Sequence, residues 1–223
     1  MPENPFSDAI VFHLGPVPVA GQVVTTWAIM AALALLCWLA LRRRRTEAGW
    51  LQTVLEIFVV TAEKQIEAVV QRGAARLLPL LGTLFLFLLV ANLSTAVPGL
   101  SPPTSHLETP AALAAIVFFA SHWYGVRAQG VGAYLRHYIR PNFLMLPLNL
   151  LAEVTRTFAL AVRLFGNIMS HEIVLAILLL LAGLFLPVPF LLLGVLIGAI
   201  QAYIFTILAT IFLGAAIGSV AID

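Results

Sequence analysis

The sequence predicts an all-α polytopic membrane protein. Of its 223 residues, 61% are hydrophobic and only 10% are charged, a composition too apolar for a soluble domain. The mean hydropathy is +1.03, and several apolar runs reach about twenty residues, the length of one membrane crossing. We expect about five membrane-embedded helices, one interfacial amphipathic helix and little mass outside the bilayer.

The first predicted span covers residues 23–41 and is followed at once by four arginines, at positions 42–45. A signal peptide carries its positive charges before its apolar core, whereas here they come after it. The segment is therefore expected to stay as an anchor, preceded by a short outside tail of residues 1–22.

An amphipathic helix is predicted over residues 48–71. Apolar side chains recur there at helical spacing, and charged residues lie among them. We expect this helix to lie in the plane of the membrane interface. A cytoplasmic amphipathic helix packed on a partner protein remains the alternative.

Residues 77–97 and 111–126 are the next two predicted spans, and they are expected to form a hairpin around an outer loop. A cytoplasmic segment, 127–142, follows them. The basic residues predict this topology, because seven lie between the first two spans and three follow the third, while the outside tail and the outer loop contain none. The positive-inside rule then places the amino terminus outside and the carboxyl terminus in the cytoplasm.

From residue 143 onward the chain is almost continuously apolar. Pro187 and Pro189 interrupt it, so two long helices are expected, 143–186 and 189–222. We expect them to form a tilted hairpin, so that the whole chain, 1–223, is a single membrane domain.

Several classes of function lack their signals. The sequence has no G-x-x-x-x-G-K-[ST] loop, so the chain is not expected to bind ATP in that way. No basic tract alternates with aromatic residues, which argues against a nucleic-acid partner. The single cysteine, Cys37, lies in an apolar run and is expected to pack between helices. We expect no metal and no cofactor.

Four charged side chains interrupt the final apolar region: Glu153, Arg156, Arg163 and Glu172. A charge at this depth costs about 2.5–3.5 kcal/mol on insertion scales, and such residues usually serve a function. At 100° per residue, Arg163 and Asn167 share one helix face, whereas Glu172 points to the opposite face about 13 Å further along. Glu172 is therefore not the intrahelical partner of Arg163. Glu153 and Arg156 either neutralise each other at i, i+3 or line an aqueous entrance.

Three more polar residues lie in the same region. His171 either relays protons or only donates a hydrogen bond. Gln201 and Tyr203 lie in the last apolar run, and a buried amide such as that of Gln201 needs partners, for which Arg163 is a candidate. Two G-x-x-x-G pairs on the last helix permit close helix approach, either within the chain or against another helix that slides past.

These motifs resemble a known family. RLFGN, a glutamate nine residues after its arginine, and QAYIFTILATIFL on the next helix closely resemble subunit a of the rotary F-type ATP synthase. PPTSHLETPAALA is similar to the outer loop of that family, and the resemblance covers essentially the whole chain. It implies an ion-translocating stator subunit in a bacterial cytoplasmic (inner) membrane. Its partners would be the c-ring, whose small subunits each carry one essential carboxylate, and subunit b of the peripheral stalk.

The resemblance also implies residue roles. Arg163 would separate two half-channels that open to opposite sides of the membrane, and its permanent charge would favour the ionised form of a passing ring carboxylate. The ion carried would be H⁺ or Na⁺. The resemblance implies that five further residues line the ion pathway: Asn167, His171, Glu172, Gln201 and Glu153. Two more residues have a secondary role, Arg156 and Tyr203.

One position departs from the family pattern. Many members have a small residue before the glutamate and a histidine seven residues before the glutamine. Here His171 precedes Glu172, and Gly194 stands seven residues before Gln201. The pair looks exchanged, which implies that the outer pathway is preserved with altered details.

Two other hypotheses compete with the stator. A free-standing secondary transporter would use the buried arginine to bind an anionic substrate, but no inverted repeat is evident. A membrane scaffold would not need charged residues on opposed faces of one helix. The transporter predicts substrate uptake by the isolated chain, and the stator predicts none without its ring.

Overall fold

The computed structural model describes residues 10–14, 17–42, 50–70, 73–96, 102–139, 145–183 and 187–218. Apart from one short β-hairpin, the described residues are mainly helical. The helices are α1 (Gly21–Arg42), α2 (Trp50–Val69), α3 (Ala74–Leu93), α4 (Glu108–Gln129), α5 (Val131–Ile139), α6 (Met145–Ala182) and α7 (Pro187–Ile217). Two 3₁₀ turns, η1 (Ser94–Ala96) and η2 (Pro103–Ser105), lie between α3 and α4.

The described helices confirm an all-α polytopic membrane protein. Four of them, α3, α4, α6 and α7, are long and apolar enough to cross a membrane. Helix α1 contributes a shorter apolar run, Val23–Leu39. Many large apolar side chains face outward, such as Phe119 and Trp123 of α4, which are 69% and 66% exposed. In water such a surface would be unfavourable, but in a bilayer it contacts lipid.

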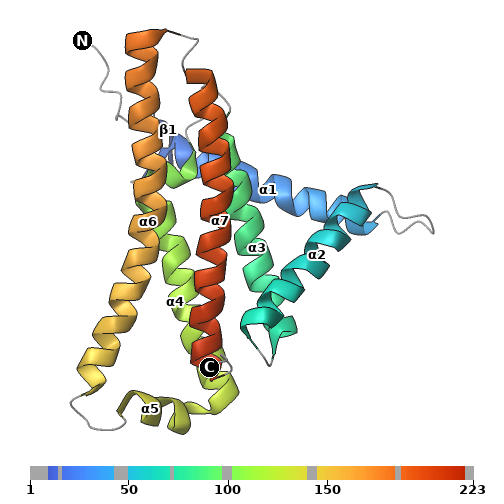
Figure 1. The fold of residues 1–223 in the computed structure, drawn as a ribbon, viewed down its shortest axis with the longest axis vertical. Coiled ribbons are helices and arrows are strands. Elements are labelled where there is room, and N and C mark those ends of the chain that lie inside the picture. The colour runs from blue at the N-terminus through green and yellow to red at the C-terminus, as the bar shows by residue number, and fades with distance from the viewer. Residues whose placement is uncertain are drawn as a thin grey trace.

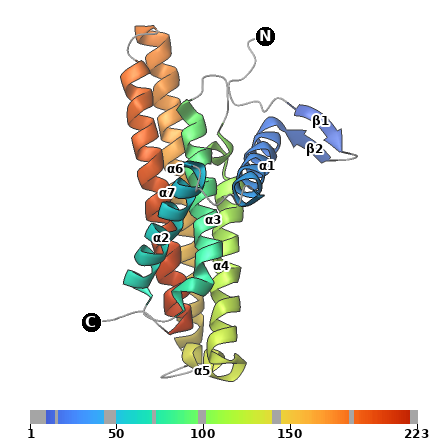
Figure 2. The same cartoon turned by 90° about the vertical axis from the view of Figure 1, so that its right-hand side faces the viewer.

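The four long helices form an elongated bundle. Helices α6 and α7 run side by side, and α7 packs on α3 and α4 while α6 packs on α4 (Figure 1). Helix α1 extends across the long axis of the bundle, and α2 runs obliquely to contact α3 (Figure 1). The β-hairpin lies next to the start of α1 (Figure 2). The buried stripes of α3 and α7 follow helical spacing and form the centre of a core to which α2, α4 and α6 also contribute: Leu77, Leu81, Leu84 and Leu88 from α3, and Ala202, Phe205, Ala209 and Leu213 from α7.

The α6–α7 pair is longer than a bilayer is thick. At 1.5 Å per residue, the 38 residues of α6 and the 31 residues of α7 extend over about 57 Å and about 46 Å. The hydrocarbon core measures about 30 Å. Helices of this length either tilt strongly or extend beyond the hydrocarbon core, so the tilt of the hairpin stays a prediction.

The helix ends differ from the expected ones for local reasons. Helix α4 begins at Glu108, because Pro110 is tolerated in a first helical turn, and ends where Gly130 adopts a φ of 82°. Helix α7 begins at Pro187 itself, for the same reason as at Pro110.

Two regular segments were not expected. The region expected to be an outside tail contains an antiparallel hairpin, β1 (Ile10–Leu14) with β2 (Val17–Ala20). In the sequence, residues 10–14 (IVFHL) are rich in β-branched and aromatic side chains, which favour a strand. The segment expected to be cytoplasmic, 127–142, contains the short helix α5.

Three helix ends that are distant in the sequence meet at one end of the bundle. The Tyr124 hydroxyl of α4 donates to the Arg76 carbonyl oxygen at the start of α3 (3.3 Å). The Gln129 amide donates to the Ala216 carbonyl oxygen near the end of α7 (2.8 Å). Together with Arg127 at the end of α4, these residues define a basic end of the bundle.

Gly125 is packed where this junction is tightest. A β-carbon added there would overlap the ring of Tyr134 and lie 3.0 Å from the Ala216 carbonyl oxygen. We expect Gly125→Leu to lower the unfolding free energy by about 1–3 kcal/mol through overpacking, measured by thermal unfolding in detergent. Gly132→Leu on α5 is the matched control, because a β-carbon there meets nothing within 4 Å. Equal melting temperatures for the two variants would contradict the packing described.

Candidate functional site

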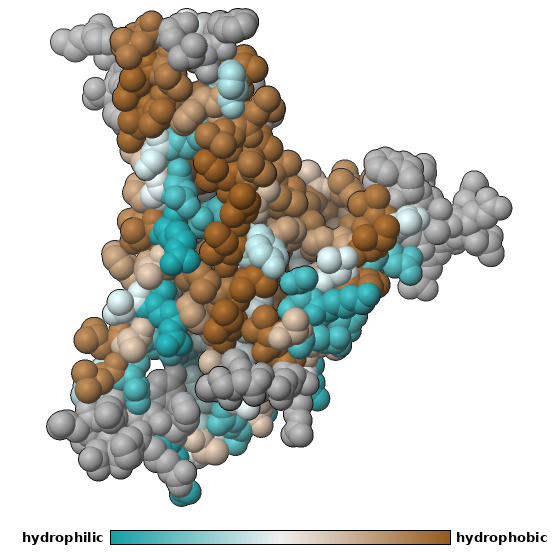
Figure 3. Space-filling model, viewed as in Figure 1, coloured by the Kyte–Doolittle hydropathy of each residue, from teal (hydrophilic) through white to brown (hydrophobic). Residues whose placement is uncertain are grey.

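A row of polar side chains follows the exposed face of α6. Arg156, Arg163, Asn167 and Ser170 are all exposed, and neighbouring α6 residues such as Phe158 are exposed and apolar. The space-filling view shows this hydrophilic column within an apolar surface (Figure 3). A membrane helix rarely turns two cations toward lipid, so this row is the first candidate functional feature.

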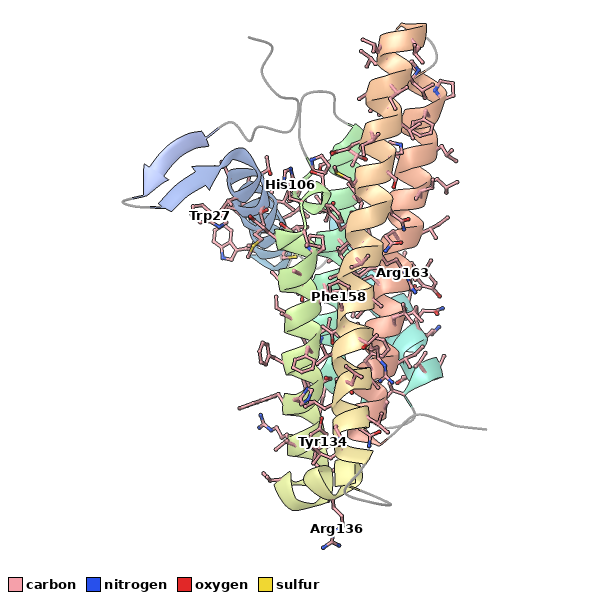
Figure 4. All side chains as sticks on the ribbon, turned by 90° about the vertical axis from the view of Figure 1, so that its left-hand side faces the viewer. Trp27, His106, Tyr134, Arg136, Phe158 and Arg163 are labelled. Carbon is pink, nitrogen blue, oxygen red and sulfur yellow. The ribbon has the colours of Figure 1, made fainter. Side chains whose placement is uncertain are left out.

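Arg163 is at the centre of the row. It lies on the side of the α6–α7 pair that faces away from α4 (Figure 4). Among the described residues, no carboxylate lies within ion-pair distance of its guanidinium and no hydrogen bond involves it. This chain therefore supplies no counter-charge from its described part.

Asn167, one turn beyond Arg163, ties α6 to α7. Its amide nitrogen donates to Oε1 of Gln201 over 2.6 Å. Gln201 is only 2% exposed, and its Nε2 has no hydrogen-bond partner among the described residues. The sequence suggested Arg163 as the partner of Gln201, whereas the structure pairs Gln201 with Asn167 and leaves one buried donor available.

Arg156 has local partners that Arg163 lacks. Its guanidinium is 4.0 Å from the Glu153 carboxylate and lies over the ring of Phe212 on α7, 4.9 Å from the ring centroid. The i, i+3 pairing foreseen from the sequence is present, and the cation–π contact adds to it. The two arginines of α6 are therefore in different environments.

His171 fills the space left by a glycine on α7. Its ring stacks on Phe190 with centroids 4.6 Å apart, and its Nε2 is 3.2 Å from the Phe190 carbonyl oxygen. A β-carbon built on Gly194 would overlap the imidazole ring. The two residues that look exchanged in the sequence therefore touch, and a side chain at either position would occupy the same space.

Glu172 faces the other side of α6 from the exposed row. It is partly buried, and the side chain of Ser105 in η2 approaches its carboxylate. Helix α6 packs against η2 at this level. The structure therefore separates Glu172 from Arg163, in agreement with the helical-wheel argument.

A buried polar cluster lies next to η2 and was not predicted from the sequence. Asn92 of α3 is fully buried; its amide donates to the Gly198 carbonyl oxygen of α7 (2.8 Å), and its Oδ1 accepts from the Thr104 hydroxyl of η2 (3.2 Å). The sequence does indicate such a cluster, because Asn92 lies inside an apolar span and its side chain needs hydrogen-bond partners there. This cluster joins three elements beside the segment that carries Ser105.

Tyr203 belongs neither to the exposed row around Arg163 nor to the surroundings of Glu172. Its side chain is 47% exposed, and its hydroxyl donates to Oε1 of Gln65 on α2 over 3.2 Å. The structure therefore places Tyr203 at the contact between α7 and α2 rather than beside Arg163. Among the described residues, no group of three or more histidine, cysteine or acidic side chains is arranged to hold a metal ion.

The arrangement thus has two polar groupings on either side of α6. One is the exposed row around Arg163, and the other is the partly buried set of Glu172, His171 and the η2 loop. Asn167 of the exposed row also connects α6 with α7 through its contact with Gln201. Polar side chains in an apolar bundle can hold water and pass ions.

Comparison with known proteins decides the family. The family described as ATP synthase A chain matches residues 23–214. The protein "ATP synthase subunit a 2" of Bradyrhizobium sp. is 53% identical over 221 residues, covering 99% of both chains. "ATP synthase subunit a 2" of Pelobacter propionicus is 48% identical over 209 residues, covering 94% of this chain and 92% of its own.

The chain belongs to the ATP synthase A chain family. The resemblance noted in RLFGN and QAYIFTILATIFL is thereby confirmed over nearly the whole length of the chain. All candidate site residues, from Glu153 to Tyr203, lie within the part that matches the family.

The contact of His171 with Gly194 can be tested by a double-mutant cycle. Gly194→Val should collide with the imidazole and destabilise the α6–α7 pair by about 1–3 kcal/mol, and His171→Gly in the same chain should restore much of that loss. Thermal unfolding of the two single variants and the double variant measures the coupling. Additive losses would mean that the two side chains do not share one space.

Proposed function

We propose that this chain is the ion-translocating stator subunit of an F-type ATP synthase. It would provide two half-channels and the arginine that couple transmembrane ion flow to rotation of the c-ring. The observation that carries the proposal is Arg163, which is exposed on the membrane face of α6 with no counter-charge among the described residues. The family membership supports it.

The physics of the arginine fits this role. A guanidinium stays protonated at all physiological pH values, whereas a buried lysine can lose its proton. A permanent cation favours the ionised form of a carboxylate that approaches it and so promotes release of that carboxylate's ion. It also repels a cation that would pass directly between the half-channels. Each elementary charge that crosses 100 mV delivers about 2.3 kcal/mol, so a leak would waste the coupling.

The two polar groupings fit two separate half-channels. Glu172, beside Ser105 of η2, and His171, against Phe190 and Gly194 of α7, would line the outer pathway. Glu153 and Arg156 lie nearer the start of α6 and would line the inner entrance. Asn167 and Gln201 lie between them, and the available Nε2 donor of Gln201 would hydrogen-bond a water or a ring carboxylate.

The orientation follows from the charges. The basic end of the bundle, with Arg76 and Arg127, would face the cytoplasm of a bacterium, the amino terminus would lie outside and the carboxyl terminus inside. The c-ring would contact the exposed row of α6, and subunit b of the peripheral stalk would hold the chain against rotation. The ion would be H⁺ or Na⁺, selected mainly by the ring. ATP chemistry would belong to other subunits of the complex.

Arg163→Ala tests the proposal in the assembled complex reconstituted in vesicles. We expect normal assembly but loss of ATP-driven ion pumping, more than 90%, because a ring carboxylate could no longer exchange its ion at the stator. Thr155→Ala is the matched control, since Thr155 is an exposed residue of the same helix outside the polar row, and its hydroxyl donates to the Leu151 carbonyl oxygen within α6 (2.8 Å). Pumping by Arg163→Ala at the wild-type rate would overturn the proposal.

Glu172→Gln tests the outer pathway. This change keeps the size and hydrogen-bonding ability of the side chain but removes the charge, so we expect several-fold slower ion flux with unchanged assembly. Glu67→Gln on the exposed face of α2 is the control. Unchanged flux would make Glu172 a packing residue. Uptake of an anionic solute by the isolated chain would instead favour the transporter hypothesis.

A further inference from the structure

A cavity of about 200 Å³ lies between α2, α3 and α7, outside the two polar groupings. Its inner wall is made by buried or partly buried apolar side chains, among them Phe58, Ile66, Leu81 and Phe85. The rings of Phe58 and Phe85 stack with centroids 5.7 Å apart. Three other lining residues are exposed and mark the mouth of the cavity: Thr61, Gln65 and Tyr203.

The interior has almost no hydrogen-bonding capacity for a water molecule. The two threonine hydroxyls in its wall are already used, because Thr206 donates to the Ala202 carbonyl oxygen (2.9 Å) and Thr210 to the Thr206 carbonyl oxygen (2.7 Å). An engineered apolar cavity of about 150 Å³ stays dry and binds a small hydrocarbon. A larger apolar cavity in a membrane protein is accordingly suited to a hydrocarbon ligand.

The mouth, in contrast, is polar and has a positive charge beside it. The Tyr203 hydroxyl donates to Gln65 across it. Lys64 is exposed next to Gln65 and, at 100° per residue, lies about 60° from Thr61 on the α2 wheel. The carboxylates Glu63 and Glu67 lie further round the helix, about 160° and 120° from Thr61. The charge closest to the mouth on α2 is therefore positive.

We propose that this cavity binds an acyl chain of an anionic phospholipid. The hydrocarbon chain occupies the space between Phe58, Phe85 and α7, while the phosphate lies at the mouth near Lys64. An apolar interior with a polar, positively flanked rim matches an amphiphile that ends in an anion, and does not match a neutral hydrocarbon or a water cluster. The lipid would fill the joint between α2 and α7. This inference rests on the lining of the cavity and on the charge beside its mouth, and does not depend on the proposed function.

The test uses the full chain in its complex, reconstituted in vesicles that contain phosphatidylglycerol with a photoactivatable group on one acyl chain. After illumination, mass spectrometry maps the labelled peptides. Gly82→Leu blocks the site, because a β-carbon at Gly82 lies 4.0 Å from the Phe58 ring and a larger side chain extends into the cavity. Ala62→Phe, which blocks the cavity from α2, is the second variant should the first not assemble.

We expect at least fivefold less labelling of the α2, α3 and α7 peptides in the blocked variant, with unchanged labelling of α4 around Phe119, which faces lipid. Gly132→Leu should label as the wild type does. Equal labelling of the cavity peptides in wild type and blocked variant would overturn the proposal, as would recovery of a peptide of another subunit crosslinked there.

The headgroup has its own test. Lys64→Gln should reduce the preference for phosphatidylglycerol over phosphatidylcholine severalfold while both lipids still label the cavity, and Glu67→Gln should leave that preference unchanged. If wild-type chain is labelled equally by the two lipids, the assignment of an anionic headgroup is wrong.

Discussion

The structure depends on one electrostatic constraint, an unpaired cation on an apolar surface. Arg163 is exposed on α6 among side chains that would contact lipid, and its guanidinium has no partner in the described part of the chain. A charge in such a place costs about 2.5–3.5 kcal/mol or more unless something compensates it. Arg156, seven residues away, has that compensation from Glu153 and Phe212. The contrast within one helix supports the proposal that Arg163 meets its counter-charge on another chain.

Contacts between α6 and α7 fix the register of the two helices, and this register fixes the position of the Arg163 guanidinium. Asn167 reaches Gln201 across the two helices, and His171 lies directly on Gly194. On the side of α6 that faces the bundle, Asn92 joins α3, η2 and α7 next to the loop that brings Ser105 to Glu172. A carboxylate on that side and a cation on the other are separated by the body of α6. Two aqueous pathways that do not meet would need such a separation.

The long apolar helices, their order and the polar positions of α6 could be predicted from the sequence, because apolar runs and the 100° repeat are local properties. The pairing of Asn167 with Gln201 could not, since it depends on the register between α6 and α7, which no periodicity reports. Asn92 was missed for a different reason: one asparagine in a long apolar span is easily treated as tolerated. The β-hairpin before α1 was not predicted, because its strands of five and four residues are too short to show a clear periodicity.

The most direct measurement is disulfide crosslinking from the exposed row of α6 to the ring. Ser170→Cys places a thiol on that face near Arg163, and Phe119→Cys on α4 is the control on a lipid face. With a cysteine next to the ring carboxylate, we predict rapid crosslinking of position 170 to one c subunit, and to different copies when ATP turnover precedes oxidation. The control should not crosslink. Absence of crosslinks from position 170, or crosslinking of the control at the same rate, would contradict a counter-charge that arrives from the ring.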